Sequence, residues 1–240
     1  MFDHVTIRVS DRHASRRFYA TVLGTLGRDV RREELFDEWD EFSIAQASEE
    51  HPATRRLHVG FAARSRDEVD AFWHAGVDAG HESDGEPGPR PIYHERYYGA
   101  FLLDPDGNSV EAVHHGRRPE EEAIIDHLWL RVADAAASRR FYEALEPVLG
   151  LGLRDGRWGP TIERGECSFT LLDGPPTENV HLAFPVADNA GVGEFHRAAL
   201  AAGYRDNGAP GERPIYHPGY YGAFVLDPDG NNVEAVCHNR

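Results

Sequence analysis

Six residues of this 240-residue chain have the types and spacing of metal ligands. Each half carries two histidines and one glutamate: His4, His58 and Glu111, then His127, His181 and Glu234. The spacings agree, because 58 − 4 and 181 − 127 are both 54, and 111 − 58 and 234 − 181 are both 53. Two imidazoles and one carboxylate hold a divalent metal and leave coordination positions open. The sequence therefore predicts up to two sites for a divalent metal, with Fe²⁺, Mn²⁺, Ni²⁺, Co²⁺ and Zn²⁺ as candidates.

The six residues lie in an internal repeat, in which residues 2–118 match residues 125–240 at an offset of 123. Such a repeat is interpreted before the fold, because it sets the structural unit. The match is clearest between residues 90–113 and 213–236, which share Arg-Pro-Ile-Tyr-His and Asp-Pro-Asp-Gly-Asn. We expect two domains, 1–118 and 124–240, each near the common domain size. The charged, proline-containing segment 117–122 predicts the linker between them.

Two further histidines, His94 and His217, occupy matching positions in the repeated segment, close to pairs of tyrosines. A histidine near its ordinary pKa suits general acid or base catalysis beside a metal. The same rings also suit the wall and apolar lip of a pocket, and both interpretations stay open. His114, His115 and His238 follow the last strand of each half, and we interpret them as surface residues without a role.

The strands expected to hold these residues alternate between apolar and polar side chains. Residues 3–9 place Val5, Ile7 and Val9 on one face and His4 on the other, and residues 126–132 repeat this pattern. Residues 57–62 alternate in the same way around His58. A period of two is typical of a half-buried strand. Each histidine is therefore expected on the polar face of its strand.

Helices and a hairpin complete each module. Ser10 or Asp11 can cap a helix that stops at Gly24, and Ser65-Arg-Asp-Glu68 is a capping box that opens another. Asp-Pro-Asp-Gly at 104–107 predicts a type I turn with glycine in the left-handed position. That hairpin delivers Glu111. The order strand, helix and three strands occurs twice in each half, so the chain is expected to hold four βαβββ modules.

Composition narrows the function classes. The net charge of −16 argues against nucleic acid as a partner, and no apolar run approaches the roughly 20 residues of a membrane span. All 25 basic residues are arginine, so mechanisms that need a lysine base or Schiff base are excluded. The two cysteines indicate reduced thiols. The first strand begins without a leader segment, so we expect a cytoplasmic protein with a small-molecule substrate.

The repeated Asp-Pro-Asp-Gly-Asn-x-x-Glu, with a strand-opening histidine upstream, resembles the glyoxalase, bleomycin-resistance and extradiol-dioxygenase superfamily, also called the vicinal oxygen chelate proteins. The resemblance covers essentially the whole chain. It implies an α+β fold in which paired βαβββ modules curl into open eight-stranded cups. It also implies that the first strand of each module and the last strand supply the metal ligands, which fall on the six residues above.

The resemblance leaves the subfamily open. Glyoxalase I has a fourth protein ligand at the end of the first module, and residues 43–46 and 168–171 contain no acid there. The extradiol-dioxygenase signature expects a tyrosine where this chain has Phe101 and Phe224. Fosfomycin-resistance transferases use a lysine, which this chain lacks, and bleomycin-binding members lack the metal ligands.

We therefore expect a metal-dependent enzyme that chelates its substrate through two neighbouring oxygens, by lyase, isomerase or dioxygenase chemistry. Glu111 or Glu234 is expected to carry a proton during the reaction, as in similar enzymes. The alternative is a non-catalytic protein that sequesters an antibiotic or another hydrophobic ligand.

The halves resemble a homodimer fused into one chain, and a further homodimer is left open. Their modules can pair in two ways. In the unswapped arrangement, His4 meets His58 and Glu111 within the first half. In the swapped arrangement, His4 meets His181 and Glu234, and His127 meets His58 and Glu111. We expect the unswapped arrangement, because each half is a complete pair of modules.

Overall fold

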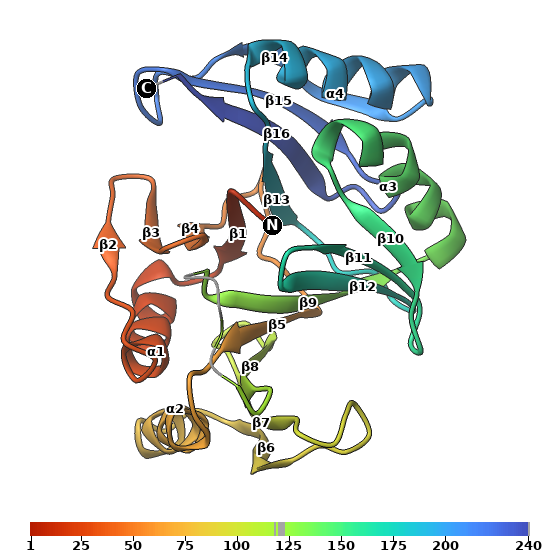
Figure 1. The fold of residues 1–240 in the computed structure, drawn as a ribbon. Helices are drawn as coiled ribbons and strands as arrows, with labels where there is room; N and C mark the ends of the chain where they lie inside the picture. Colours follow the sequence, from red (N-terminus) through yellow and green to blue (C-terminus); the bar gives the residue numbers. More distant parts are fainter. Residues whose placement is uncertain (118, 120–122, 240) are drawn as a thin grey trace. The chain divides into compact units, whose positions relative to one another are not determined.

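The computed structural model of the chain describes residues 1–117, 119 and 123–239. The order strand, helix and three strands occurs four times along the described chain (Figure 1), as the sequence predicted. The α+β class is therefore confirmed. The expected linker at 117–122 falls mostly outside the described residues.

The first two modules lie between residues 4 and 114. Their elements are β1 (His4–Val9), α1 (Arg12–Gly24), β2 (Arg31–Arg32), β3 (Phe36–Trp39), β4 (Phe42–Gln46), β5 (Leu57–Ala62), α2 (Arg66–Asp78), β6 (Ser83–Pro89), β7 (Tyr98–Leu103) and β8 (Ser109–His114). The last two modules lie between residues 125 and 238. Their elements are β9 (Ile125–Val132), α3 (Ala135–Leu149), β10 (Gly152–Asp155), β11 (Pro160–Arg164), β12 (Cys167–Asp173), β13 (Val180–Pro185), α4 (Asn189–Ala201), β14 (Arg205–Glu212), β15 (Tyr220–Leu226) and β16 (Asn232–His238).

The strands form two open, mixed sheets of eight strands each. One has the order β14-β15-β16-β13-β1-β4-β3-β2, and the other has the order β10-β11-β12-β9-β5-β8-β7-β6. Within them, β13 is parallel to β16 and β5 is parallel to β8. Each first strand of a module therefore lies beside a strand that ends a module, which is where the ligands were expected.

By their contacts, the residues divide into two compact units. One consists of Met1–Val5 with Leu130–Arg240, and the other of Thr6–Trp129. In the first unit α3 packs against α4, and α4 also contacts β14, β15 and β16. In the second unit α1 packs against α2. There α1 also contacts β4, and α2 contacts β7. The division into domains 1–118 and 124–240 stays a prediction.

Side-chain caps explain where the helices begin. Asp11 accepts a hydrogen bond from the backbone N–H of Ala14, and Ser65 accepts one from Glu68. The second half of the capping box differs from the expectation. The Glu68 carboxylate accepts from the N–H of Arg64, 2.7 Å away, and also pairs with the Arg64 guanidinium. The charge of that guanidinium favours the carboxylate at this position.

The alternation in the ligand-bearing strands is as predicted. In β1 the side chains of Val5, Ile7 and Val9 are buried, whereas His4 is partly exposed. The turn before β8 is also as predicted, since Gly107 has φ +81° and its N–H donates to the carbonyl of Asp104. The turn and the alternation of side chains together set the strand register, and this register places Glu111 and Glu234 on the same sheet face as the histidines.

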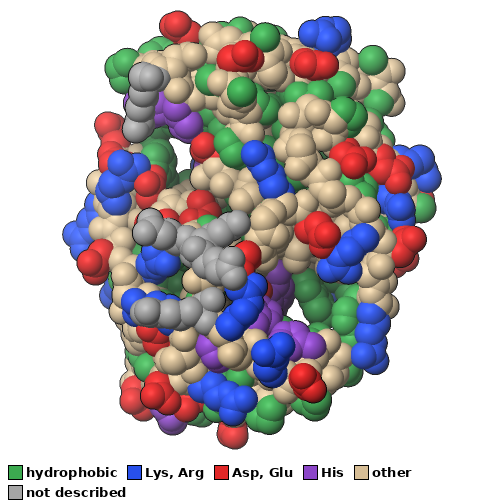
Figure 2. Space-filling view, viewed as in Figure 1, with side chains coloured by type: hydrophobic (Ala, Val, Ile, Leu, Met, Phe, Trp, Pro, Cys, Tyr) green, Lys and Arg blue, Asp and Glu red, His purple; other side chains and the backbone are tan. Residues whose placement is uncertain are grey.

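The surface shows no extended field of a single charge on the face drawn in Figure 2, where arginine and acidic side chains are interspersed. Within the described residues, no helix is both long and apolar enough to cross a membrane. The scattered charge agrees with an interpretation in terms of solubility rather than of a cationic partner.

Candidate metal centres

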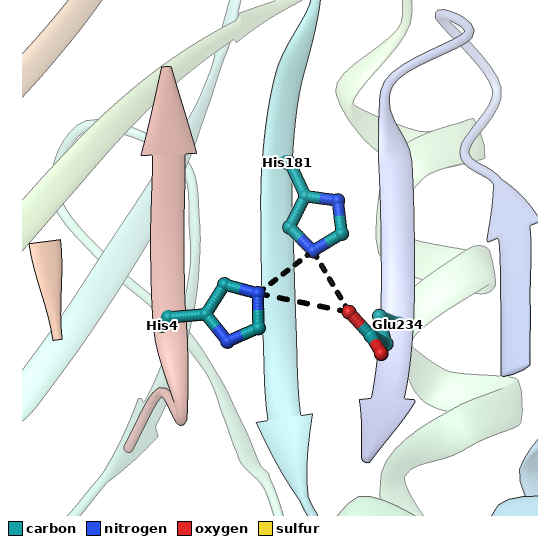
Figure 3. Close-up of side chains that lie close together, drawn as sticks. All are labelled: His4, His181 and Glu234. Carbon is teal, nitrogen blue, oxygen red and sulfur yellow. Dashed lines mark hydrogen bonds and ion pairs between the residues drawn. The ribbon is translucent and has the colours of Figure 1, made fainter. Parts of the chain in front are cut away.

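Three adjacent strands bring His4, His181 and Glu234 together (Figure 3). The Nε2 atoms of His4 and His181 are 3.2 Å apart. The Oε2 atom of Glu234 lies 3.0 Å from Nε2 of His181 and 3.7 Å from Nε2 of His4. The two imidazole rings are stacked, with an angle of 7° between their planes. Three ligand atoms therefore face one common point.

His58, Glu111 and His127 form a second cluster of the same kind. The Nε2 atoms of His58 and His127 are 3.1 Å apart, and the Oε2 atom of Glu111 lies 3.1 Å and 3.4 Å from them. In each cluster the three ligand atoms lie within 4.8 Å of one another. The side chain of each glutamate is only 1% exposed, so the carboxylates approach the histidines from the protein interior.

These clusters show that the expected unswapped arrangement is wrong. His4 meets His181 and Glu234, and His127 meets His58 and Glu111. The physical reason is the strand order, because β1 lies beside β13 and β9 lies beside β5. Each histidine of a half's opening strand thus completes the ligand set of the other half.

Close packing around each glutamate depends on a glycine of the neighbouring strand. A Cβ atom added at Gly99 would lie 2.3 Å from Oε1 of Glu111, and one at Gly222 would lie 2.4 Å from Oε1 of Glu234. A Cβ atom is essentially never this close to an atom to which it is not bonded, so any larger residue must displace the carboxylate. Both glycines lie in the repeated Tyr-Tyr-Gly-Ala segment, whose tyrosines were noted from the sequence but whose glycines were given no role.

We expect Gly99→Ala to weaken metal binding at the His58–Glu111–His127 cluster by roughly 10–100-fold, the range found when the groups that support metal ligands are altered. The added methyl group pushes Glu111 away from the two histidines. Isothermal titration with a divalent metal measures the effect. Gly24→Ala is the control, since a Cβ there meets nothing within 4 Å. Equal affinities in parent and Gly99→Ala would contradict this account of the glycine.

A tyrosine holds the remaining oxygen of each carboxylate. The hydroxyl of Tyr97 donates to Oε1 of Glu111 at 2.8 Å, and that of Tyr220 donates to Oε1 of Glu234 at 2.7 Å. Burial and the adjacent carboxylate raise the pKa of both tyrosines far above the usual value. The tyrosines therefore stay protonated and fix the carboxylate orientation.

Behind His127 lies a chain of hydrogen-bonded side chains that ends at His94. Asp126 accepts from Nδ1 of His127 at 2.7 Å and from Nε2 of His115 at 2.9 Å. His115 in turn lies 2.8 Å from Nε2 of His94. Because the Asp126 carboxylate accepts a hydrogen on Nδ1, the Nε2 atom of the neutral His127 ring has a lone pair that points at the cluster.

The same chain is repeated behind His4. Asp3 lies 2.8 Å from Nδ1 of His4 and 2.8 Å from Nε2 of His238, and His238 lies 2.9 Å from His217. The expectation that His115 and His238 have no role missed these contacts. The Asp-His pair that opens both β1 and β9 was the available signal. A catalytic role for His94 and His217 stays a prediction.

Electrostatics distinguish the two clusters. Burial raises the pKa of Glu234 to about 7, and the charge of His4 offsets only part of that effect. Burial acts in the same direction on Glu111, but hydrogen bonds from His127 and His58 outweigh it and lower the pKa. Burial lowers the pKa of His127, yet its hydrogen bonds to Asp126 and Glu111 outweigh burial and raise the pKa to about 10.

The donor set fits a divalent metal. In the His58 cluster, two nitrogen lone pairs and a carboxylate oxygen converge in a buried position, so a positive charge must lie among them. The carboxylates of Asp126 and Glu111 raise the pKa of His127, so a proton on its ring supplies positive charge when no metal does. Nitrogen and carboxylate ligands in this ratio suit first-row divalent metals.

Comparison with known protein families identifies the superfamily of this chain. The model of the Glyoxalase/Bleomycin resistance protein/Dioxygenase superfamily matches residues 1–112 and again residues 124–235. The chain belongs to this superfamily. Both matched segments contain one complete set of two histidines and one glutamate, so each glyoxalase-type repeat contributes three of the six candidate ligands.

Solved structures of the superfamily share the fold along the whole chain. Glyoxalase I from Zea mays is 20% identical with a TM-score of 0.69, and the match covers 99% of this chain and 92% of that one. A putative dioxygenase from Bacillus subtilis is 14% identical with a TM-score of 0.67, covering 100% and 85%. No curated protein sequence matches this chain. At these identities the likeness shows the fold alone.

Proposed function

We propose that the chain is a divalent-metal-dependent enzyme that binds a small substrate through two neighbouring oxygens. The observation that carries the proposal is the convergence of two Nε2 atoms and one carboxylate oxygen in each of two clusters. A bound metal would act as a Lewis acid on oxygens of the substrate. Lyase, isomerase and dioxygenase reactions all use such chemistry.

The protein residues have separable roles in this proposal. Four histidines and two glutamates hold the metals, while Tyr97 and Tyr220 orient the glutamates through hydrogen bonds of 2.8 Å and 2.7 Å. Glu111 and Glu234 also accept or return the proton of the substrate. His94 and His217 are proposed to assist proton transfer.

Metal content and turnover test the proposal together. We expect two divalent ions per chain after reconstitution and dialysis, and we expect a chelator to abolish turnover of any substrate that is found. A protein that stays free of metal with Fe²⁺, Mn²⁺, Ni²⁺, Co²⁺ and Zn²⁺ would overturn the proposal. A substrate turned over equally well after chelation would leave only structural metals.

Ring cleavage of catechols is expected to be weak or absent in the Fe²⁺-loaded protein. Phe101 pairs with Glu111 across β7 and β8, and its ring centroid lies 6.0 Å from that of His58. A phenyl ring at this position cannot donate or accept the proton that a tyrosine would handle. Oxygen uptake with a panel of catechols measures the activity. Rapid uptake with any of them would contradict the expectation.

A non-catalytic, ligand-sequestering protein is the second candidate. The observation in its favour is that the apolar side chains Ile92, Ile215 and Tyr216 of the repeated Arg-Pro-Ile-Tyr-His segments are exposed. It would bind its ligand equally well with and without metal, whereas the enzyme requires the metal for turnover.

A further inference from the structure

The two clusters have the same ligands but differ behind one histidine of each. On the His58 side, Nδ1 of the ring lies 3.1 Å from Oγ of Ser109, and Ser109 donates to Asp84 at 2.8 Å. At the matching positions of the other half stand Asn232 and Asn207. The difference therefore replaces a hydroxyl and a carboxylate with two amides.

Hydrogen-bond directions fix the state of His58. The Asp84 carboxylate only accepts, so the Ser109 hydroxyl gives it its single hydrogen. Oγ of Ser109 can then only accept, and Nδ1 of His58 must carry the hydrogen between them. The Nε2 atom of His58 is consequently left with the lone pair that a metal requires.

The corresponding chain leaves His181 undetermined. Nδ2 of Asn232 lies 2.5 Å from Nδ1 of His181, and Oδ1 of Asn232 accepts from Asn207 at 2.9 Å. In this orientation Nδ1 of His181 accepts, so the hydrogen of a neutral ring is on Nε2 and faces Glu234. Turning both amides by 180° reverses each direction without loss of a hydrogen bond. The amide pair therefore allows either tautomer of His181, and only one of them binds a metal through Nε2.

The hydrogen bonds behind the other histidine of each cluster are matched, although the Trp129 ring beside His58 and His127 has only Thr6 at the matching position. His127 and His4 each have an aspartate at Nδ1, at 2.7 Å and 2.8 Å. One other difference lies close by. Gly60 leaves room for the His127 ring, where an added Cβ would lie 2.3 Å from it, and Ala183 occupies the matching position in the other half.

We propose that Asp84 and Ser109 are positioning residues that make the His58–Glu111–His127 cluster the tighter of the two divalent-metal sites, so that it fills first. This inference rests on the proposed function, because it presumes that both clusters bind metal. Asn207 and Asn232 make the His4–His181–Glu234 cluster the weaker site. The chain then has two sites that are equal in ligands and unequal in affinity.

A titration of the metal-free, full-length protein with Co²⁺ tests the order of filling. The Trp129 ring lies 5.7 Å from that of His58, so Co²⁺ bound there quenches its fluorescence. We expect the first equivalent to give the quenching and the second to add little. The Trp129→Phe protein is the control for the signal. Quenching that develops only with the second equivalent would overturn the inference.

Exchanged pairs test the residues themselves. We expect the Asp84→Asn, Ser109→Asn double variant to weaken the tighter site on the order of 10-fold. The reciprocal Asn207→Asp, Asn232→Ser variant should tighten the other site by a similar factor. Each variant uses residues that the other half already carries, so folding is expected in both. If neither pair changes an affinity, the unequal filling has another source, such as Gly60, and the inference fails. If the parent binds no Co²⁺, Zn²⁺ or Mn²⁺ at all, the proposed function fails with it.

Discussion

His58→Ala is expected to lower the metal content of the reconstituted protein from two ions per chain to one. The substitution removes one of three ligand atoms from a cluster whose glutamate is buried, so that the remaining two bind a divalent ion weakly. The His4–His181–Glu234 cluster shares no ligand with it and keeps its ion. Elemental analysis after dialysis gives the stoichiometry.

The exposed His51→Ala protein serves as the control and should retain two ions. Loss of both ions from His58→Ala, with the fold intact by circular dichroism, would contradict independent sites. Retention of both ions would show that His58 is not a ligand.

The metal-free protein is expected to lose stability as the pH rises from about 6.5 to about 10. The pKa of His127 is raised to about 10 in the folded protein, against an ordinary value of 6.5. In this window the folded state binds more protons than the unfolded state, so the free energy of unfolding falls with rising pH. The contribution is fully present below about 6.5 and is on the order of a few kcal/mol.

Urea denaturation at several pH values measures this effect. The His127→Gln protein should show a smaller decline over the same window, because it lacks the group that titrates. Saturating metal should also reduce the decline, since the metal replaces the proton of the cluster. Identical pH profiles for parent and His127→Gln would show that His127 does not hold the proton.

Much of the fold could be predicted from local sequence. Strand alternation placed His4 and His58 on polar faces, Asp11 marked a helix start, and Asp-Pro-Asp-Gly marked the turn before Glu111; the structure has all of these. Such features depend on neighbours within a few residues. Strand faces, helix starts and turns of this kind can therefore be predicted from the sequence alone.

The pairing of the modules could not be predicted in the same way. Because the halves repeat with one spacing, His4 and His127 are equivalent in sequence, and either can complete either ligand set. The choice depends on which long-range strand pairs form, namely β1 beside β13 and β9 beside β5. That each half contains a complete pair of modules does not determine which of these strand pairs form.

The supporting residues were partly visible in the sequence. Asp3 and Asp126 precede the strand histidines in both halves, and a carboxylate next to a candidate ligand is a recognisable pattern. The contribution of Gly99 and Gly222 required coordinates, because only the structure shows a carboxylate where their side chains would be.

The central claim is that each metal centre combines ligands from both halves of the sequence. Two double variants test it most directly by metal stoichiometry. His4→Ala with Glu234→Ala removes two ligands of one cluster, so this protein should still bind one ion in the other. His4→Ala with Glu111→Ala removes one ligand from each cluster, so it should bind none. The reverse result, one ion with Glu111→Ala and none with Glu234→Ala, would contradict the account.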